Sequence, residues 1–294
     1  MNFVDVAEAA RQNQFKWALL PFYKDNKAFQ GVASPKSARP LWGMTLLAAG
    51  SMRFRWNETN PNRERFLSEL CGAKQIVPLE LIHSKIVYDA REAGDTFQKQ
   101  GDAIITQNAA LVPIVTVADC VPIYFYDSAT GAFGAAHSGW KGTGIAGEVV
   151  KMMKEKYGSN PRDILAAVGP HIHDCCYTVD AGRAKYFCDN FGSDCVREVS
   201  QGQDWGGPGL FGHEQNFLQD KKYALSLLRA NLNVLAAAGV LEENVVAATN
   251  CTSCDARFGS FRREAAGLPD IPGQDKSRLF TTQAAFVIIE ERES

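Results

Sequence analysis

The chain of 294 residues has little net charge and lacks a long apolar run. Lys and Arg together number 31 and Asp and Glu number 33, so the formal net charge is −2. Binding to a nucleic-acid backbone or to anionic lipid requires a clustered excess of Lys and Arg. No stretch approaches the roughly 20 apolar residues that cross a bilayer. We therefore expect neither a nucleic-acid partner nor a membrane span.

The first twenty residues also lack the basic start and the continuous apolar segment of a secretory signal. This absence predicts a cytoplasmic protein, in which thiols stay reduced. The eight cysteines are then expected to be free, and most of them to be small buried side chains. Cys251 and Cys254 form a single CxxC. Without a second pair or a histidine at finger spacing, this motif does not favour a zinc ribbon, and nothing further supports a redox role.

Apolar residues, by contrast, are plentiful. They make up 46% of the chain and charged residues 22%, which is typical of a globular protein with a large core. The length is common for one large α/β unit. Because no internal repeat, low-complexity tract or interdomain linker is apparent, we predict a single domain spanning 1–294.

The local patterns predict strands in consecutive runs, with helices gathered elsewhere. We expect strands at 77–87, 103–106, 111–117, 121–126, 132–136, 163–168, 245–249, around 258–261, and at 284–290. Helical spacing of apolar residues predicts helices at 62–72, 143–157 and 216–238, the last capped by Gly239. This order favours an α+β layered sandwich over a strict βαβ alternation.

Three residues with metal-ligating atoms stand at the ends of apolar, strand-like segments: His83, Cys120 and His137. Loops that leave strand ends form clefts, so these side chains are placed to converge. Two imidazoles and one thiolate suit zinc, and three protein ligands leave the fourth position open, as in catalytic sites. The ligands have no fixed short spacing. The residues alone therefore leave open a buried thiol with two hydrogen-bonded histidines.

The segment Gly139-Trp140-Lys141-Gly142-Thr143 has two glycines around a cation, with Thr143 at the expected start of a helix. Backbone N–H groups and the helix dipole at such a place favour an anion such as phosphate. The alternative is a tight strand-to-helix turn with a solvated lysine.

Two further segments carry polar groups without an assigned role. Arg262 and Arg263 either form a second anion clamp or make a surface ion pair with Glu264. His171 and His173 follow a Gly-Pro turn, and we interpret them as two exposed imidazoles in a loop, with a place in the lining of the cleft as the alternative.

Taken together, several segments resemble the YfiH-like family, also called the multicopper polyphenol oxidoreductase or laccase-domain family. They are Gly101-Asp102-Ala103-Ile104-Ile105-Thr106, Ala118-Asp119-Cys120-Val121-Pro122, Ala136-His137-Ser138-Gly139-Trp140-Lys141-Gly142-Thr143, Val168-Gly169-Pro170 with Tyr177-Thr178-Val179, Cys251-Thr252, and Ser260-Phe261-Arg262-Arg263. They occur in the family's order, from about residue 62 to the C-terminus. Residues 1–60 would be a divergent part of the same catalytic domain.

The resemblance implies a layered α/β/β/α sandwich with mixed sheets, in which His83, Cys120 and His137 bind Zn²⁺, with copper as the alternative ion. The implied activity is that of a purine nucleoside phosphorylase. It would cleave adenosine, inosine and methylthioadenosine with phosphate, with adenosine deamination as a companion activity.

On this basis, the catalytic residues are expected to be Cys120, His137, Lys141 and Asp119, and the residues that bind substrate and phosphate Lys141, Arg262 and Ser138. Asp119 would orient a histidine, accept a proton or make a structural hydrogen bond. The partners would be a purine nucleoside and phosphate, and the protein a monomer or homodimer.

The sequence departs from the family pattern at two places near these residues. Ser84 follows His83 where the family has glycine, and Lys141 replaces an arginine and so loses the guanidinium fork. Arg278 is a candidate for a downstream arginine of the family.

Three alternatives remain at this stage. A hydrolase or amidase with Cys120 as nucleophile and His137 as base, acting on a cell-wall precursor, is the first. Copper-dependent phenol oxidation is disfavoured, because a multicopper centre needs more than the five histidines present. A binding protein that retains the fold is the third.

Overall fold

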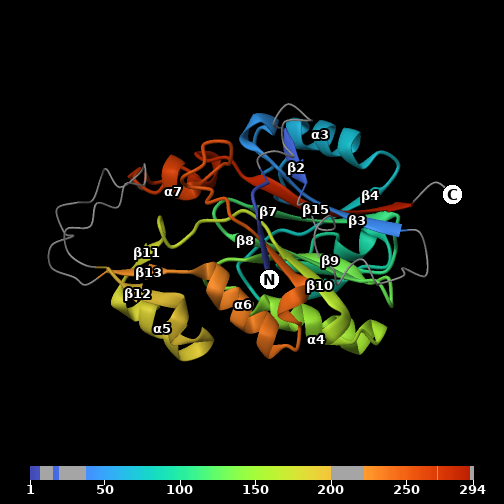
Figure 1. Ribbon diagram of the computed structural model, residues 1–294. Coiled ribbons are helices and arrows are strands. Elements are labelled where there is room, and N and C mark those ends of the chain that lie inside the picture. Colours follow the sequence, from blue (N-terminus) through green and yellow to red (C-terminus); the bar gives the residue numbers. More distant parts are fainter. Residues whose placement is uncertain (7–15, 20–37, 200–221, 270, 292–294) are drawn as a thin grey trace.

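The computed structural model describes residues 1–6, 16–19, 38–199, 222–269 and 271–291 (Figure 1). The α-helices of this part are α3 (Pro61–Cys71), α4 (Ile145–Tyr157), α5 (Ala181–Phe191), α6 (Leu227–Ala237) and α7 (Phe261–Glu264). The strands are β1 (Asn2–Val4), β2 (Trp17–Leu19), β3 (Ala38–Thr45), β4 (Gln75–Pro78), β5 (Val87–Asp89), β6 (Ala103–Thr106), β7 (Leu111–Val117), β8 (Val121–Asp127), β9 (Phe133–Ser138), β10 (Ile164–Val168), β11 (Thr178–Val179), β12 (Val196–Glu198), β13 (Tyr223–Leu225), β14 (Val245–Ala248) and β15 (Gln283–Glu291).

Two mixed sheets form the centre of the molecule. The first has seven strands in the order β1-β14-β10-β8-β9-β6-β5, and the second has five in the order β2-β3-β15-β7-β4. In the first sheet, β10, β8, β9 and β6 pair antiparallel, whereas β1, β14 and β10 run parallel, as do β5 and β6. A third, small sheet, β11-β13-β12, lies beside α5 at one end of the molecule (Figure 1).

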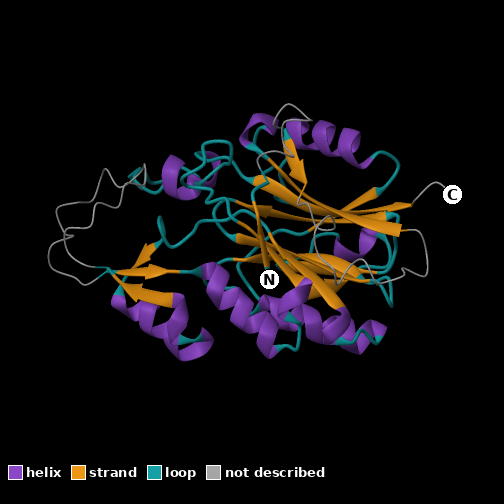
Figure 2. Cartoon of the chain, viewed as in Figure 1, coloured by secondary structure: helices purple, strands orange, loops and turns teal. Residues whose placement is uncertain are grey.

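The layers stack as helix, sheet, sheet, helix. Helix α3 covers the five-stranded sheet, and α4 and α6 cover the seven-stranded sheet (Figures 1 and 2). Strand β8 shows why both faces of a central strand are apolar. Ile123 and Phe125 pack on the helical side, whereas Tyr124 and Tyr126 pack between the sheets. A strand buried on both faces reads as a continuous apolar run rather than an alternation.

Each interface between layers has its own apolar core. Val149, Met153 and Leu235 belong to the core under α4 and α6, and Leu67, Met52 and Phe286 to the core under α3. Full burial of such a side chain contributes roughly 1.5–3 kcal/mol to stability. These cores hold the strand ends that carry the candidate site.

The predicted fold class, an α+β layered α/β/β/α sandwich with mixed sheets, is confirmed. The central strands β6 to β9 lie within two residues of their predicted bounds, as do β10, β14 and β15. The helix predicted at 62–72 is α3, which ends at Gly72, and the helix predicted at 143–157 begins at Ile145 because Gly144 has a left-handed backbone with φ 107°.

Three predicted elements were wrong. The strand expected at 77–87 ends at Pro78, and the chain then forms a loop that contains His83 before β5 begins. The long helix expected at 216–238 covers only Leu227–Ala237, because β13 pairs with β11 and β12 immediately before it; residues 216–221 lie outside the described part. The segment expected as a strand around 258–261 instead leads into α7, which begins at Phe261, and the Ser260 side chain caps this helix by accepting from the N–H of Arg263.

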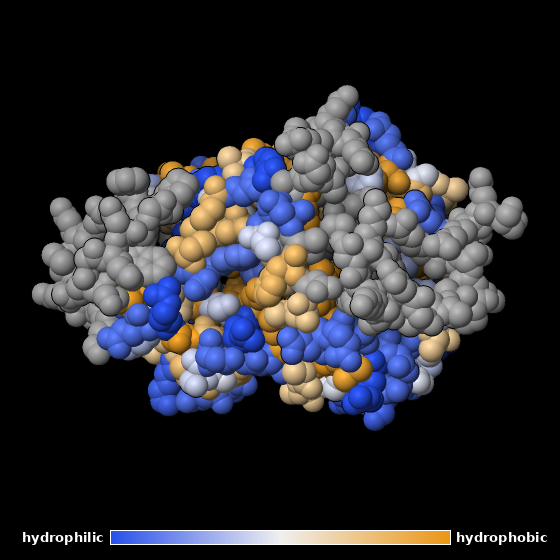
Figure 3. All heavy atoms as spheres, viewed as in Figure 1, coloured by the Kyte–Doolittle hydropathy of each residue, from blue (hydrophilic) through white to orange (hydrophobic). Residues whose placement is uncertain are grey.

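In the described part of the chain, no helix combines the length and the apolar character needed to span a bilayer. Figure 3 agrees with this on the face it shows, since mostly hydrophilic residues lie along the lower edge, over the helical layer.

Candidate active site

Strand pairing brings together residues that are far apart in the sequence. Strands β8 and β9 pair with Pro122 opposite His137, so Cys120, just before β8, lies near the end of β9. On the other side of β9, Ala103 pairs with Ala136, which places Asp102 beside His137.

The third residue reaches the same place from a loop. Strand β5 runs parallel to β6 with Val87 opposite Ala103, and the loop that enters β5 carries His83. His83, Cys120 and His137 thereby meet at one edge of the seven-stranded sheet.

The donor atoms of His83, Cys120 and His137 all lie within 4.8 Å of one another. Sγ of Cys120 lies 4.0 Å from Nε2 of His83, and the two imidazole rings meet edge to face with their centroids 4.8 Å apart. His137 is buried and His83 is exposed, so the group opens to one side. Two nitrogens and one sulfur at these separations fit one small divalent cation with an open coordination position.

Asp102 fixes both histidines. Its Oδ1 lies 2.9 Å from Nδ1 of His137 and accepts the backbone N–H of His83 at 3.0 Å. Its Oδ2 accepts the backbone N–H and the hydroxyl of Ser84. Because Nδ1 of His137 faces a carboxylate, Nε2 is the nitrogen left to bind a metal. His83 has a left-handed backbone with φ 59°, and these hydrogen bonds hold that uncommon conformation.

Asp102 also explains the Ser84 departure. The serine hydroxyl adds a hydrogen bond to the carboxylate, so Ser84 supports the position of Asp102 instead of interrupting it.

The ionisation of the site is strongly coupled. Burial favours the neutral thiol of Cys120, but the charge and hydrogen bond of His137 outweigh burial and lower the pKa of Cys120 to about 6. Burial alone would lower the pKa of His137, but the Cys120 thiolate and Asp102 raise it to about 10. For Asp102, burial opposes ionisation, and the hydrogen bond and charge of His137 lower its pKa overall. The sulfur is therefore held as a thiolate, the form that binds metals.

Gly139 leaves the space that the three donor atoms occupy. A Cβ at this position would lie 2.8 Å from Cδ2 of His83 and 3.0 Å from Sγ of Cys120. A side chain there would push on both ligands, so the first glycine of the Gly-Trp-Lys-Gly segment is required by close approach.

A cavity of about 460 Å³ opens in front of the three residues, within the size range of small-molecule sites. Its described lining includes the aromatic residues Phe54, Trp140, Tyr177, Phe261 and Phe280 and the arginines Arg53, Arg55, Arg183 and Arg262. The cavity therefore offers flat apolar surfaces and positive charge next to the candidate metal ligands.

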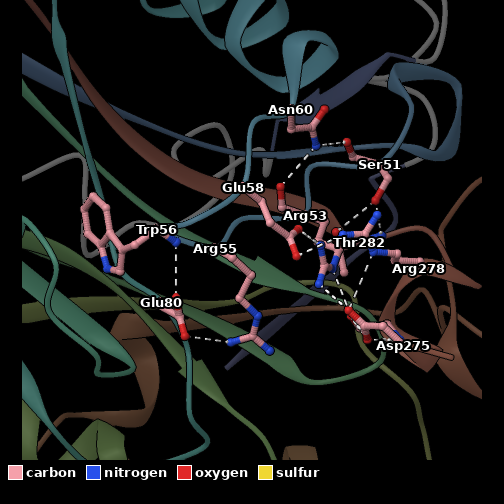
Figure 4. Close-up of polar contacts among 11 residues, drawn as sticks. Ser51, Arg53, Arg55, Trp56, Glu58, Asn60, Glu80, Asp275, Arg278 and Thr282 are labelled. Carbon is pink, nitrogen blue, oxygen red and sulfur yellow. Dashed lines mark hydrogen bonds and ion pairs between the residues drawn. The ribbon is translucent and has the colours of Figure 1, made fainter. Parts of the chain in front are cut away.

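Two of these arginines are paired with carboxylates. Arg53 forms ion pairs with Glu58 and Asp275, and Arg55 lies 3.3 Å from Glu80 (Figure 4). The same network joins Ser51 to Thr282 by a hydroxyl contact of 3.2 Å. These contacts fix one wall of the cavity and neutralise much of its charge.

The other two arginines stack on aromatic rings. The guanidinium of Arg183 lies 4.2 Å from the ring centroid of Trp140, and that of Arg262 lies 5.7 Å from the centroid of Tyr177. Stacking orients a guanidinium group while leaving its edge free to donate hydrogen bonds to an anion.

Asp119 lines the cavity, and its carboxylate hydrogen-bonds to residues other than the histidines of the site. It accepts the hydroxyl of Thr252 at 2.7 Å and the backbone N–H of Arg262 at 2.6 Å. Its backbone is left-handed, with φ 78°, and burial raises the pKa of its carboxyl. Of the three roles expected for Asp119, the structural hydrogen bond is the one observed, and the role of orienting a histidine belongs to Asp102.

Two residues expected to bind phosphate are not among those that line the cavity. Lys141 is exposed and does not line the cavity; its ammonium lies 5.3 Å from the ring centroid of Trp140. Ser138 is buried and donates to the side chain of Asn231 on α6 at 2.8 Å. Successive side chains of β9 point to opposite faces, so His137 faces the site and Ser138 faces the helices.

For Arg262 and Arg263 the sequence left two alternatives, an anion clamp and an ion pair with Glu264, and the two residues differ in their surroundings. Arg262 lines the cavity, whereas Arg263 pairs with Glu264 at 3.1 Å and donates to the carbonyls of Thr252, Ser253, Asp255 and Phe258. Arg278 pairs with Glu58 and does not line the cavity.

The interpretation of His171 and His173 as exposed imidazoles was wrong. His171 is fully buried, with Nδ1 2.8 Å from the carbonyl of Gly169, and His173 is partly buried.

Sequence reasoning missed Asp102, Arg183 and the segment 53–55. Asp102 belongs to the Gly101–Thr106 segment and directly precedes the buried strand β6, a position from which the sequence could have indicated it as a site residue. Arg53 and Arg55 lie in a segment without secondary structure, and Arg183 lies on α5, so no local pattern marked them.

Comparison with known proteins identifies the family of the chain. Residues 55–268 match the family model described as multi-copper polyphenol oxidoreductase laccase. The chain is 37% identical over 169 residues to purine nucleoside phosphorylase YlmD of Geobacillus stearothermophilus, covering 55% of each protein. It is 32% identical over 171 residues to adenosine deaminase RL5 of an unknown prokaryotic organism, covering 55% of this chain and 56% of that protein. These matches thus span about half the length of the relatives.

The fold matches over a longer range. The crystal structure of YlmD from Geobacillus stearothermophilus superimposes with a TM-score of 0.68 and 27% identity, covering 90% of this chain and 95% of that one. With the family model matched over more than half of its residues, the chain belongs to the multi-copper polyphenol oxidoreductase laccase family.

Proposed function

We propose that this protein is a zinc-dependent purine nucleoside phosphorylase that acts on adenosine, inosine and methylthioadenosine, with adenosine deamination as a side activity. The observation that carries the proposal is the convergence of His83, Cys120 and His137 on one point of a cavity lined by arginines and aromatic rings. The names of two relatives, a purine nucleoside phosphorylase and an adenosine deaminase, support the two reactions.

The donor set supports Zn²⁺ as the ion. Two imidazole nitrogens and one thiolate leave a fourth tetrahedral position free, and zinc bound there would supply a Lewis acid. The chain's own contribution is to orient the ligands. Asp102 holds His137 by its Nδ1, and Gly139 leaves room for the donor atoms of His83 and Cys120.

Phosphate binding is assigned to Arg183 and Arg262 rather than to Lys141 and Ser138. Both guanidinium groups line the cavity and are stacked on rings, and planar guanidinium forks bind phosphate oxygens bidentately. Their role would be to hold phosphate in line with the ribose carbon and to neutralise its charge.

The purine is assigned to the aromatic part of the cavity. Phe261 and Phe280 meet edge to face with centroids 5.3 Å apart, and Phe54 lies on the same lining. Aromatic rings bind bases by stacking, which is tolerant of the base identity. This tolerance supports a range of purine nucleosides instead of a single one.

The cavity also bears on domain organisation. Its lining extends from Arg53 to Thr282, so we propose that these residues belong to one catalytic domain, which spans 1–294.

The direct test follows inosine turnover by purified protein with and without phosphate. The expected result is release of hypoxanthine that depends on phosphate and is lost in His83→Ala, together with bound zinc near one ion per chain at this site. Adenosine is assayed in parallel without phosphate, where inosine formation reports deamination. Absence of phosphate-dependent hypoxanthine in zinc-replete protein would contradict the proposal.

A second candidate is a Cys-His hydrolase, supported by the lowered pKa of Cys120 and the hydrogen bond between His137 and Asp102. Here Cys120 would be the nucleophile and His137 its base, oriented by the carboxylate. Amide cleavage by metal-free protein, abolished by iodoacetamide at Cys120, would favour this function over phosphorolysis.

A further inference from the structure

A second group of metal-ligating side chains lies outside the site described above. Cys175 and Cys176 stand in the loop after β10, and Cys251 and Cys254 stand in the loop after β14. Because β10 and β14 are parallel neighbours, their carboxyl ends reach the same edge of the sheet. The two loops join there through a bridge between His171 and Cys251 and through the N–H of Thr252, which donates to the carbonyl of His171.

The four sulfur atoms form a compact group. Sγ of Cys254 lies 3.2 Å from Sγ of Cys176 and 3.7 Å from that of Cys175, and the Cys175 and Cys176 sulfurs are 3.8 Å apart. All four lie within 4.8 Å of one another. A disulfide would bring two of them to about 2.05 Å. Four sulfurs bound at about 2.3 Å to one zinc ion lie about 3.8 Å apart along each tetrahedral edge.

The backbone around the cluster adds an independent observation. The N–H of His173 donates to Sγ of Cys251 at 3.4 Å, and the N–H of Cys254 also hydrogen-bonds to Cys251. Backbone N–H groups directed at a cysteine sulfur stabilise its thiolate and orient it, as hydrogen bonds to metal ligands commonly do.

We propose that Cys175, Cys176, Cys251 and Cys254 bind a single Zn²⁺ ion in a structural site, separate from the group at His83, Cys120 and His137. Four thiolates close the coordination shell, so this site has no open position for substrate. The second CxxC-like pair that a zinc ribbon requires is replaced here by two adjacent cysteines from another loop. The sequence pattern alone therefore did not reveal it.

The ion joins two loops that both reach the cavity. Tyr177 follows Cys176 directly, and Arg262 lies eight residues after Cys254. The guanidinium of Arg262 stacks on the ring of Tyr177, so the metal would fix the relative position of these two cavity residues. The site's function is to hold this wall in place, and it does not depend on which reaction the cavity performs.

The test measures zinc per chain in full-length protein purified with a reductant and without chelator. Cys254→Ser and Cys176→Ser are each expected to lose about one zinc ion per chain relative to wild type. The matched control is Cys188→Ser, a partly exposed cysteine on α5 outside the cluster, which should keep the wild-type content. In a His83→Ala background, Cys254→Ser should still remove a further ion, which separates the two sites.

Cobalt replacement provides a readout that needs no variant. Charge-transfer absorption between sulfur and Co²⁺ grows with the number of sulfur ligands, so wild-type protein loaded with Co²⁺ should show the strong bands of a four-sulfur site. Equal zinc content in wild type, Cys254→Ser and Cys176→Ser would overturn the proposal. So would a cobalt spectrum of one-sulfur coordination only, or a disulfide between Cys176 and Cys254 in protein with unchanged zinc.

Discussion

Oδ1 of Asp102 accepts a hydrogen bond from Nδ1 of His137, with 2.9 Å between the two atoms. The contact lies where β6 begins and its antiparallel neighbour β9 ends. The Asp102 side chain is fully buried, and the His137 side chain is 3% exposed. This contact selects the tautomer of His137 and turns Nε2 toward Cys120 and His83. Asp102 therefore orients the candidate metal ligands His83 and His137 without being a ligand itself.

Asp102→Asn is expected to weaken metal binding at this site by roughly 10- to 100-fold, because the amide loses the charge that orients and polarises His137. Competition with a chromophoric chelator measures the affinity. Asp127→Asn is the control, since Asp127 is also buried but is the last residue of β8, at the end of the strand away from Cys120. Equal metal affinity in wild type and Asp102→Asn would show that the negative charge of Asp102 has no role in the site.

Gly139→Ala is expected to lower both metal content and turnover, because its Cβ would lie 2.8 Å from His83 and 3.0 Å from Cys120. Gly147→Ala in α4 is the matched control. Its Cβ would meet only Val234, at an ordinary 3.5 Å. The control should keep activity and gain about 0.5–1 kcal/mol of stability, since alanine favours a helix interior. Metal analysis and thermal melts test both variants, and a fully active, metal-replete Gly139→Ala protein would refute the steric argument.

Arg262→Ala is expected to raise KM for phosphate by roughly 10- to 100-fold, because a hydrogen bond to a charged group is lost. The Tm should change little. Arg263→Ala should instead lower stability by about 2 kcal/mol or more, because its guanidinium donates to backbone carbonyls of the same loop. Steady-state kinetics and thermal melts separate the two effects.

Lys141→Ala provides a test of the residue that the sequence favoured for phosphate. Because Lys141 is exposed and lies over Trp140, its removal should change KM for phosphate less than removal of Arg262. A larger effect at Lys141 would return the phosphate site to the segment after β9.

Glu80→Gln is expected to destabilise the protein near neutral pH and to matter less in acid. Burial raises the pKa of Glu80, but hydrogen bonds from Trp56 and Gln100 and the charge of Arg55 outweigh burial and lower it overall. A carboxylate whose pKa is lower in the folded state contributes stability above its unfolded value, 4.5, and loses it as the pH falls through the folded pKa. The difference in urea midpoint between wild type and Glu80→Gln should therefore shrink below pH 4.5. A constant difference across that range would show that ionisation is not its cause.

Much of the sheet could be predicted from local patterns. Strands β6 to β9 are short apolar runs between turn residues, and their burial on both faces left little ambiguity in their type. The elements that were wrong have their bounds set by pairing. The strand at 77–87 ends early because β4 pairs with β7 only as far as Pro78, and β13 takes the start of an apparent helix because β11 and β12 pair with it.

By itself, the sequence determined the residue types: a histidine and a cysteine at strand ends, a second histidine in a loop, a glycine beside them, and buried strands to position them. Only the tertiary structure decided which groups meet. It placed Asp102 against His137, turned Ser138 away from the cavity, and gathered four cysteines from two loops. The physical reason is that side-chain direction follows local backbone geometry, whereas proximity depends on which strands pair, and pairing is a property of the whole chain.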